Sequence, residues 1–330
     1  MLAHQLWFVD GVPAKTWSFL WEGRTIVLLA GALALTLVVR LVARSRPGLD
    51  VQPLARLVPW MPFAVRMHLG VALVGLLSGG YYLAPAMQLD KDVTGWLLGT
   101  VMAATAILLI VGWNVRIAAA VLVAAGPLGM LEFGFEAILQ RVDMLGLALF
   151  LLISGPGRWS ADHELGRIRE PTTLRLGQAV WALKVAVGFA LIAVAVTEKL
   201  ANPQLAREFT GGGVIDLNVA QALGLPIGDT EFIRAAGAIE VLFGLLLISG
   251  ALPQAIVLIA GVPFNLTLYF FGTNEMLGHL PVYGAMLVLL VFGSDPVLRR
   301  SCARLLPLRG EPVGEARVPS GGGGATELRT

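Results

Sequence analysis

The chain alternates long apolar runs with short polar segments, and the spacing of these runs predicts membrane-spanning helices. A helix needs about 20 residues to cross the hydrocarbon core of a bilayer. The pattern predicts nine spans, at residues 24–43, 67–85, 95–112, 117–133, 142–155, 178–196, 232–250, 255–271 and 281–293. We therefore expect an all-α polytopic membrane protein.

The two halves of the chain resemble each other when the sequence is shifted by 138 positions. Glycines 250, 272, 284 and 293 then fall on glycines 112, 134, 146 and 155. Self-similarity at a fixed long spacing indicates a duplicated unit, here a bundle of four helices. We expect a leading helix and interfacial linker over 1–66, a degenerate first repeat over 67–157, a second repeat over 178–295 and a largely disordered cytoplasmic tail over 296–330.

Composition agrees with a lipid environment and excludes several other classes. Hydrophobic residues make up 56% of the chain and charged residues only 14%, against about 25% charged in soluble domains. The net charge of +2 and the lack of a basic run interleaved with aromatics argue against nucleic acid as a partner. Basic residues gather after the first span, in the central loop and in the tail, which places the amino terminus outside and the carboxyl terminus in the cytoplasm.

The repeats differ in one loop, where about 20 extra residues follow Pro203 in the second copy. This insert, within residues 204–231, carries Gly211, Gly212 and Gly213 and then a short capped segment over 216–224. The pattern is typical of a lid or a surface helix, and equally of a loop lengthened without function.

Glu240 is the first candidate for chemistry, because it lies near the middle of the seventh predicted span. A carboxylate at that depth costs several kcal/mol unless it is protonated, paired or hydrated, so intramembrane acids are candidate functional residues. Asn265, near the middle of the next span, and Glu198 with Lys199 at the end of the sixth span are its predicted partners.

Glu275 and His279 form a second candidate pair just before the ninth span. They would share a face if their segment were helical, because residues four apart are neighbours on a helix. Pro281 is equally compatible with a loop that ends at the first turn of that span. The pair suits proton transfer or a polar cap on helix ends, and two ligands are too few to predict a metal site. His4, His68 and His163 are predicted as surface residues.

Three stretches together resemble one known family. They are TEKLANPQLAREF (197–209), IEVLFGLLLISG (239–250) and NEMLGHLPVYG (274–284), and they resemble the DoxX family of small four-helix bacterial membrane proteins. The matching positions are Glu198, Lys199, Glu240, Glu275, Gly278, His279 and Pro281. The resemblance implies a doubled four-helix unit in a bacterial cell membrane. Some members are linked to sulfur-compound oxidation with electrons passed to quinone, or to complexes that handle thiol and oxidative stress.

Three functional hypotheses follow. In the first, the protein is redox-associated and binds a quinone near Glu240. Glu275 and His279 then transfer protons, and the electrons come from a substrate or from a soluble partner at the cytoplasmic face. In the second, parallel repeats form a carrier for a small solute. In the third, the protein is a scaffold that recruits soluble proteins through its arginine-rich surfaces. The sequence carries no standard catalytic or cofactor motif and leaves open whether the protein is an enzyme.

Overall fold

The computed structural model describes residues 4–9, 11–45, 48–167, 170–211 and 218–307, and these residues are helical apart from loops and one isolated bridge between Tyr81 and Gln88. Seven of the described helices are long and apolar enough to cross a membrane: α2 (Gly23–Ala43), α4 (Met61–Ser78), α5 (Val93–Val111), α6 (Val115–Phe133), α10 (Thr173–Val194), α13 (Asp229–Ser249) and α15 (Thr273–Ser294). Two further apolar helices, α8 (Val142–Ser154) and α14 (Pro253–Phe271), occupy the remaining predicted positions. The prediction of an all-α polytopic membrane protein is confirmed.

Short helices connect and flank the spans. They are α1 (Ser18–Trp21), α3 (Gln52–Ala55), α7 (Phe135–Leu139), α9 (Ala161–Glu164), α11 (Pro203–Gly211), α12 (Val219–Ala222) and α16 (Leu298–Cys302). The predicted capped segment of the insert is α12, where the Asn218 side chain accepts a hydrogen bond from the backbone of Gln221. Residues 212–217, which include two glycines of the predicted hinge, and the tail from 308 lie outside the described residues.

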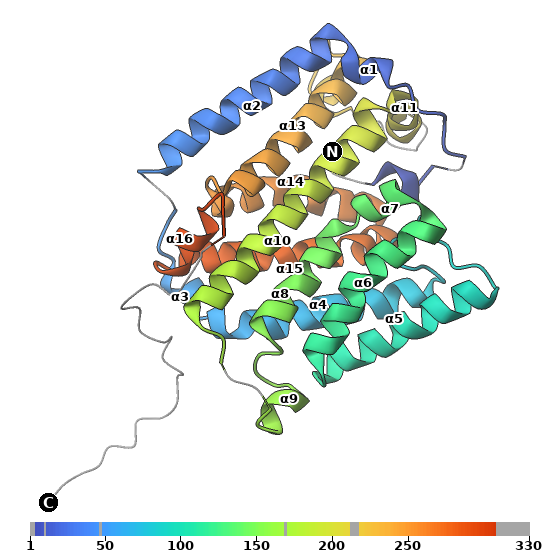
Figure 1. Cartoon of the computed structure of the whole chain (residues 1–330). Coiled ribbons are helices and arrows are strands. Elements are labelled where there is room, and N and C mark those ends of the chain that lie inside the picture. Colours follow the sequence, from blue (N-terminus) through green and yellow to red (C-terminus); the bar gives the residue numbers. More distant parts are fainter. Residues whose placement is uncertain (1–3, 10, 46–47, 168–169, 212–217, 308–330) are drawn as a thin grey trace, which may run out of the picture.

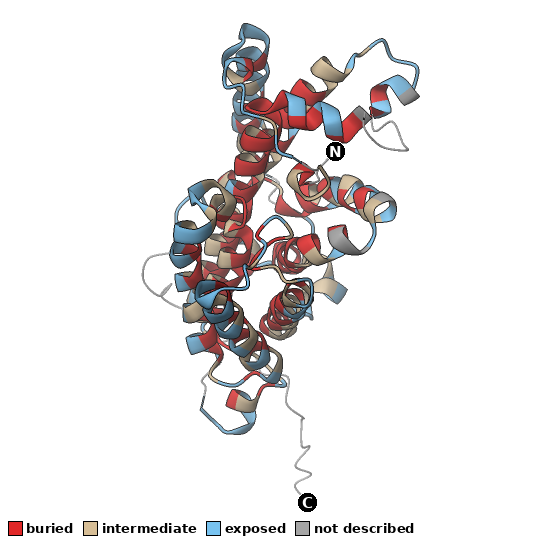
Figure 2. Ribbon diagram, turned by 90° about the vertical axis from the view of Figure 1, so that its right-hand side faces the viewer, coloured by how far each residue is buried: buried red, intermediate tan, exposed pale blue. Residues whose placement is uncertain are grey.

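The long helices form two antiparallel groups of four, α4–α5–α6–α8 and α10–α13–α14–α15 (Figure 1). The first helix of each group packs along the fourth helix of the other, so α10 lies on α8 and α4 lies on α15. This is the arrangement that a twofold axis would produce. Helix α2 packs outside α13, at the edge of the molecule opposite α5. Buried residues run through the interior, and exposed apolar residues follow the outer helices (Figure 2).

Backbone conformations recur at the shift of 138. Gly112 ends α5 and Gly250 ends α13, both in the left-handed region with φ of 77° and 73°. Two residues later, Asn114 and Leu252 both adopt φ of 47° before the next helix. A non-glycine residue in this region is uncommon, so two at equivalent places indicate a shared turn.

A buried cation supports each of these turns. In α4, Arg66 donates through Nη1 to the carbonyls of Leu109 and Ile110, each at 2.9 Å. In α10, Lys184 donates through Nζ to the carbonyl of Ile248 at 3.3 Å. The last carbonyls of a helix lack partners within it, and a nearby cation satisfies them. Each first helix thereby fastens the end of the second helix of its own group.

Three predicted helix starts were wrong, and one of them is that of α10, which begins at Thr173 and not at 178. Helix α4 begins at Met61 and not at 67, with Pro62 in its first turn, where a missing N–H costs nothing. Helix α15 begins at Thr273 and continues through Pro281. An internal proline is tolerated in a membrane helix when neighbouring helices hold it in place. The polar segment before the ninth predicted span is therefore part of the helix.

Candidate functional site: a buried cluster of ion pairs

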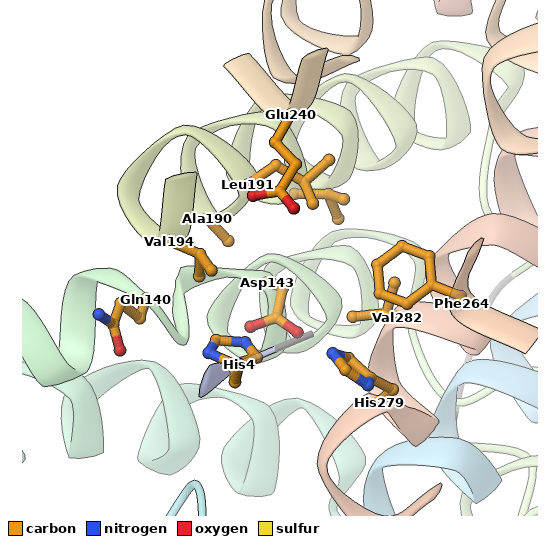
Figure 3. Close-up of a pocket in the computed structure, with 11 residues that line it drawn as sticks. His4, Gln140, Asp143, Ala190, Leu191, Val194, Glu240, Phe264, His279 and Val282 are labelled. Atoms are coloured by element: carbon orange, nitrogen blue, oxygen red, sulfur yellow. The ribbon is translucent and has the colours of Figure 1, made fainter. Parts of the chain in front are cut away.

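A cavity lies between α8, α10, α13, α14 and α15, near the end of the molecule that carries residues 4–9 (Figure 3). Four ionisable residues line it: His4, Asp143, Glu240 and His279. Its apolar wall comes mainly from α10, with Val282 and Phe264 closing the far side; the α10 residues are Val187, Ala190, Leu191 and Val194. The cavity is thus polar on one side and apolar on the other.

Each ionisable residue on the cavity has a partner that could take the opposite charge. Glu240 pairs with Lys199, Asp143 with Arg141, His4 with Glu198 and His279 with Glu275. All eight side chains are buried, and we call them the four-pair cluster. Burial of unpaired charge costs several kcal/mol, so the pairing is what allows the charged members of the cluster to lie inside the protein.

The pair on Glu240 joins α13 to the end of α10. Lys199 Nζ lies 3.0 Å from Glu240 Oε2, and both side chains are 2% exposed. Neither oxygen of Glu240 has an aligned hydrogen bond from the described residues, so the contact is an ion pair by distance. The carboxylate keeps capacity to accept a hydrogen bond from the cavity.

A π-helical turn over Ala195–Leu200 ends α10 and carries both Glu198 and Lys199. These consecutive residues are both buried yet reach different partners. Such turns are wider than an α-helical turn and are frequent at functional sites. Glu198 accepts hydrogen bonds from the backbone of Gln5 at 2.5 Å and of Leu6 at 3.3 Å, besides its contact with His4 Nδ1 at 3.1 Å.

Glu275 and His279 meet on one face of α15, with Glu275 Oε1 3.1 Å from His279 Nδ1. The helical alternative for this segment is therefore confirmed, and the loop alternative is wrong. The His279 ring packs edge-on against Phe264 of α14, with ring centroids 4.9 Å apart. Phe264 also lines the cavity. The Glu275–His279 pair is thus fixed from both helices.

Residues 4–9 close the cluster from its polar end. His4 stacks on Trp7 at 4.1 Å, and Trp7 lies within 5.8 Å of the Arg141 guanidinium. The Trp7 indole rests on Gly278, where a Cβ atom would come within 1.9 Å of the ring. The glycine therefore makes room for the tryptophan. The prediction of His4 as a surface residue was wrong, because its contacts are with distant parts of the chain; His163 is exposed, as predicted.

Burial lowers the pKa of His4 well below its usual value, and the neighbouring His279 and Arg141 lower it further. Asp143 and Glu275 oppose this shift only in part. The imidazole is therefore neutral at pH 7. A neutral imidazole has one donor and one acceptor nitrogen, so the role of Nε2 toward the cavity depends on which tautomer Glu198 holds.

The first repeat also contributes to the site. Asp143 lies in the first turn of α8, and its carboxylate lies 3.6 Å from Arg141 Nη1. Gln140 lines the cavity and donates through Nε2 to Thr197 Oγ1 at 2.7 Å. Burial lowers the pKa of the Arg141 guanidinium, and Asp143 opposes this shift. Sequence reasoning missed Gln140, Arg141 and Asp143, although an R-x-D triplet at the start of an apolar helix is a visible polar signal.

Five of the six predicted site residues belong to the four-pair cluster, and Asn265 does not. The expected contact between Asn265 and Glu240 is absent. Asn265 is exposed on α14, and its Nδ2 donates to the carbonyl of Gly261 one turn earlier at 2.7 Å. Both residues lie at similar depth, but depth alone does not define the face of a helix.

The cavity and the cluster limit what could bind. Among the residues that the structure describes, no group of three or more His, Cys, Asp or Glu is arranged to hold a metal ion. The cavity measures about 30 Å³, and a water molecule needs about 10–15 Å³ of such volume, so it has room for about two waters. Any larger ligand requires a side chain or a segment to move.

Comparison of the chain with protein-family models, with curated proteins and with solved structures finds no match.

Proposed function

We propose that this chain is a redox-associated component of a bacterial cell membrane whose four-pair cluster binds the head group of a quinone-type ligand and exchanges protons with it. The amino terminus lies outside and the carboxyl terminus in the cytoplasm, so the cluster is nearer the outer face. The DoxX resemblance agrees with this proposal, because some members of that family pass electrons to quinone.

One observation supports the proposal most directly. Both carboxylate oxygens of Asp143 and of Glu240 are buried beside the cavity without an aligned hydrogen bond from the described residues. Buried polar atoms in proteins nearly always have a hydrogen-bond partner. The hydroxyl groups of a reduced quinone are donors that would satisfy these oxygens, and the apolar wall on α10 suits its ring.

The paired bases and acids give a route for the protons. Reduction of a bound quinone takes up two electrons and two protons, and Glu240 or Asp143, next to Lys199 or Arg141, would relay the protons to its ring oxygens. The His279–Glu275 pair could supply a proton from the polar end. The electrons would come from a substrate or from a soluble partner protein at the cytoplasmic face.

The experiment compares co-purified quinone in the wild type, Glu240→Gln and Glu231→Gln after gentle isolation from native membranes. Glu231 lies on the same helix but is exposed at its start, so it is a matched control for the loss of one carboxylate. We expect near-stoichiometric quinone in the wild type and the control, and loss in Glu240→Gln. Equal quinone in all three, at the level of bulk lipid, would refute the proposal.

A small-solute carrier is the second candidate, because the cavity draws on both repeats. Gln140 and Asp143 come from the first repeat, and Glu240 and His279 come from the second. Carriers often bind substrate where structural repeats meet. Uptake of a solute by proteoliposomes that is abolished by Asp143→Asn, with no bound quinone, would favour this function over the redox function.

A further inference from the structure

A groove of about 670 Å³ runs along the outer surface between α14 and α15. Its lining is almost wholly apolar and includes Val257, Gly261, Leu266, Tyr269, Met286 and Leu290. Leu258, Val262 and Leu266 on this face of α14 are more than half exposed, as expected for residues that contact lipid. The groove is therefore open to the bilayer.

The absence of a side chain at Gly261 helps to form the groove. A Cβ atom at this position would point at Met286 of α15, 3.3 Å from its terminal methyl carbon. Any larger residue would extend into the space between the helices. The groove also holds the amide of Asn265, a polar group on an apolar surface where such groups are costly.

One layer of side chains separates the groove from the cavity. Phe264 lines the cavity and packs against Tyr283, which lines the groove, with ring centroids 6.4 Å apart. Val282 lines the cavity beside them. In Figure 3, Phe264, Val282 and His279 form the side of the cavity that faces Glu240 and Asp143. A change of the Phe264 rotamer would connect the two spaces.

Access differs between the two sides of the cluster. Residues 4–9 close the polar end through backbone hydrogen bonds to Glu198 and the packing of Trp7 on Gly278. On the bilayer side, Phe264 of α14 is the main side chain between the cavity and the groove. Pro263 has no N–H, so the same turn of α14 lacks one backbone hydrogen bond. The bilayer side therefore needs the smaller rearrangement.

We infer that the α14–α15 groove binds the polyprenyl tail of the quinone-type ligand, whose head group reaches the four-pair cluster from the bilayer past Phe264. The inference rests on the proposed function, and it adds the route of entry and the class of tail. The tail lies against Gly261 and Met286, and the head group displaces the Phe264 ring.

The test measures binding of two probes to the protein in lipid nanodiscs. One probe is decylubiquinone, and the other is the same dimethoxy-methyl-benzoquinone ring without the decyl chain. The variants are Gly261→Trp, which fills the groove, and Ala124→Trp, which places the same bulk on an exposed position of α6. Gly261→Leu is a smaller filling variant for use if Gly261→Trp does not fold.

We expect Gly261→Trp to weaken decylubiquinone binding about ten-fold or more and to leave the tailless ring unchanged. A tail gains little hydrophobic energy in lipid, so the loss reports steric exclusion from the groove. Ala124→Trp should change neither probe. If the tailless ring binds in a Glu240-dependent way but the filling variants do not affect decylubiquinone, the groove inference is wrong and the proposed function stands. If neither probe binds the wild type, the proposed function itself fails, and the inference with it.

Discussion

Lys199→Ala isolates the energetic role of the ion pair at the centre of the four-pair cluster. Lys199 and Glu240 lie 3.0 Å apart and are each 2% exposed. At an effective dielectric constant of about 20, opposite charges at this distance attract by about 5 kcal/mol. Removal of the lysine leaves a carboxylate buried in the membrane interior, and breaking buried pairs in this way costs about 3–5 kcal/mol. We expect Lys199→Ala to destabilise the protein by that amount.

The assay is thermal unfolding in one fixed detergent, followed by loss of helical circular dichroism. For a chain of this length, about 2 °C of Tm per kcal/mol gives a decrease of about 6–10 °C. Arg24→Ala is the matched control, because Arg24 pairs with Glu231 at 2.8 Å on the surface. An exposed pair contributes about 0–1 kcal/mol, so the control should lose at most about 2 °C.

The double variant Lys199→Met/Glu240→Leu completes the argument. It removes both charges together, and replacement of a buried pair by apolar side chains is often neutral or stabilising by about 1–4 kcal/mol. We expect its Tm to return close to that of the wild type, although quinone binding is lost. If Lys199→Ala melts no lower than Arg24→Ala, then Glu240 is not held in a low-dielectric interior, and the reasoning is refuted.

Three further predictions test other parts of the structure. Gly278→Val should displace the Trp7 ring, because even a Cβ atom at this position comes within 1.9 Å of the indole. The rate of hydrogen exchange at the Gln5 amide should then rise at least ten-fold. An unchanged rate would contradict the docking of residues 4–9 on the four-pair cluster. The docking of residues 4–9 on the four-pair cluster should weaken as the pH falls below about 6.5. When this segment detaches, His4 is exposed to water and takes up a proton in that range, whereas the buried His4 of the docked segment, with its lowered pKa, does not. The limiting contribution of His4 to the slope is about 1.4 kcal/mol per pH unit, read as the difference in exchange at Gln5 between the wild type and His4→Phe after correction for intrinsic rates. Lys184→Met should destabilise the protein by about 1.5–3 kcal/mol, because it leaves the carbonyl of Ile248 without its charged donor, and a Tm equal to that of the wild type would exclude this role.

The fold could be predicted largely from the sequence, because span length and hydrophobic runs are physical requirements of a bilayer. The shift of 138 found glycines that end helices in the left-handed region, as at Gly112 and Gly250. The start of α15 was missed because polar residues such as Glu275 look like loop when their partners are unknown. Proline at 281 reinforced that error, since it is favoured at helix starts.

The site was predicted only in part, and the misses have one cause. Depth along a helix can be counted from the sequence, but the direction of a side chain depends on how the helices pack. Glu240 faces inward and Asn265 faces lipid, although both lie near the middle of their helices. His4 belongs to the site through its contact with Glu198, 194 residues away, which no local pattern encodes.

The asymmetry of the two repeats explains why the cluster forms at only one of the two junctions between them. At the shift of 138, Met102 stands where the second repeat has Glu240, and it is 1% exposed in an apolar core. The loop of the first repeat that resembles Lys199–Pro203 places Tyr82 inside the bundle, where its ring stacks on Phe133 and its hydroxyl donates to the carbonyl of Ala125. Burial raises the pKa of Tyr82 to about 12, so the phenol stays neutral. The first repeat is thus filled and neutral at the positions that correspond to Glu240 and Lys199. A filled apolar core stabilises the folded protein. The four-pair cluster instead costs desolvation energy, which the attraction between the paired charges only offsets. If the two groups of helices arose by duplication, the costlier arrangement kept in one of them is expected to serve a function, and the proton exchange that we propose would be such a function for the cavity-lining carboxylates.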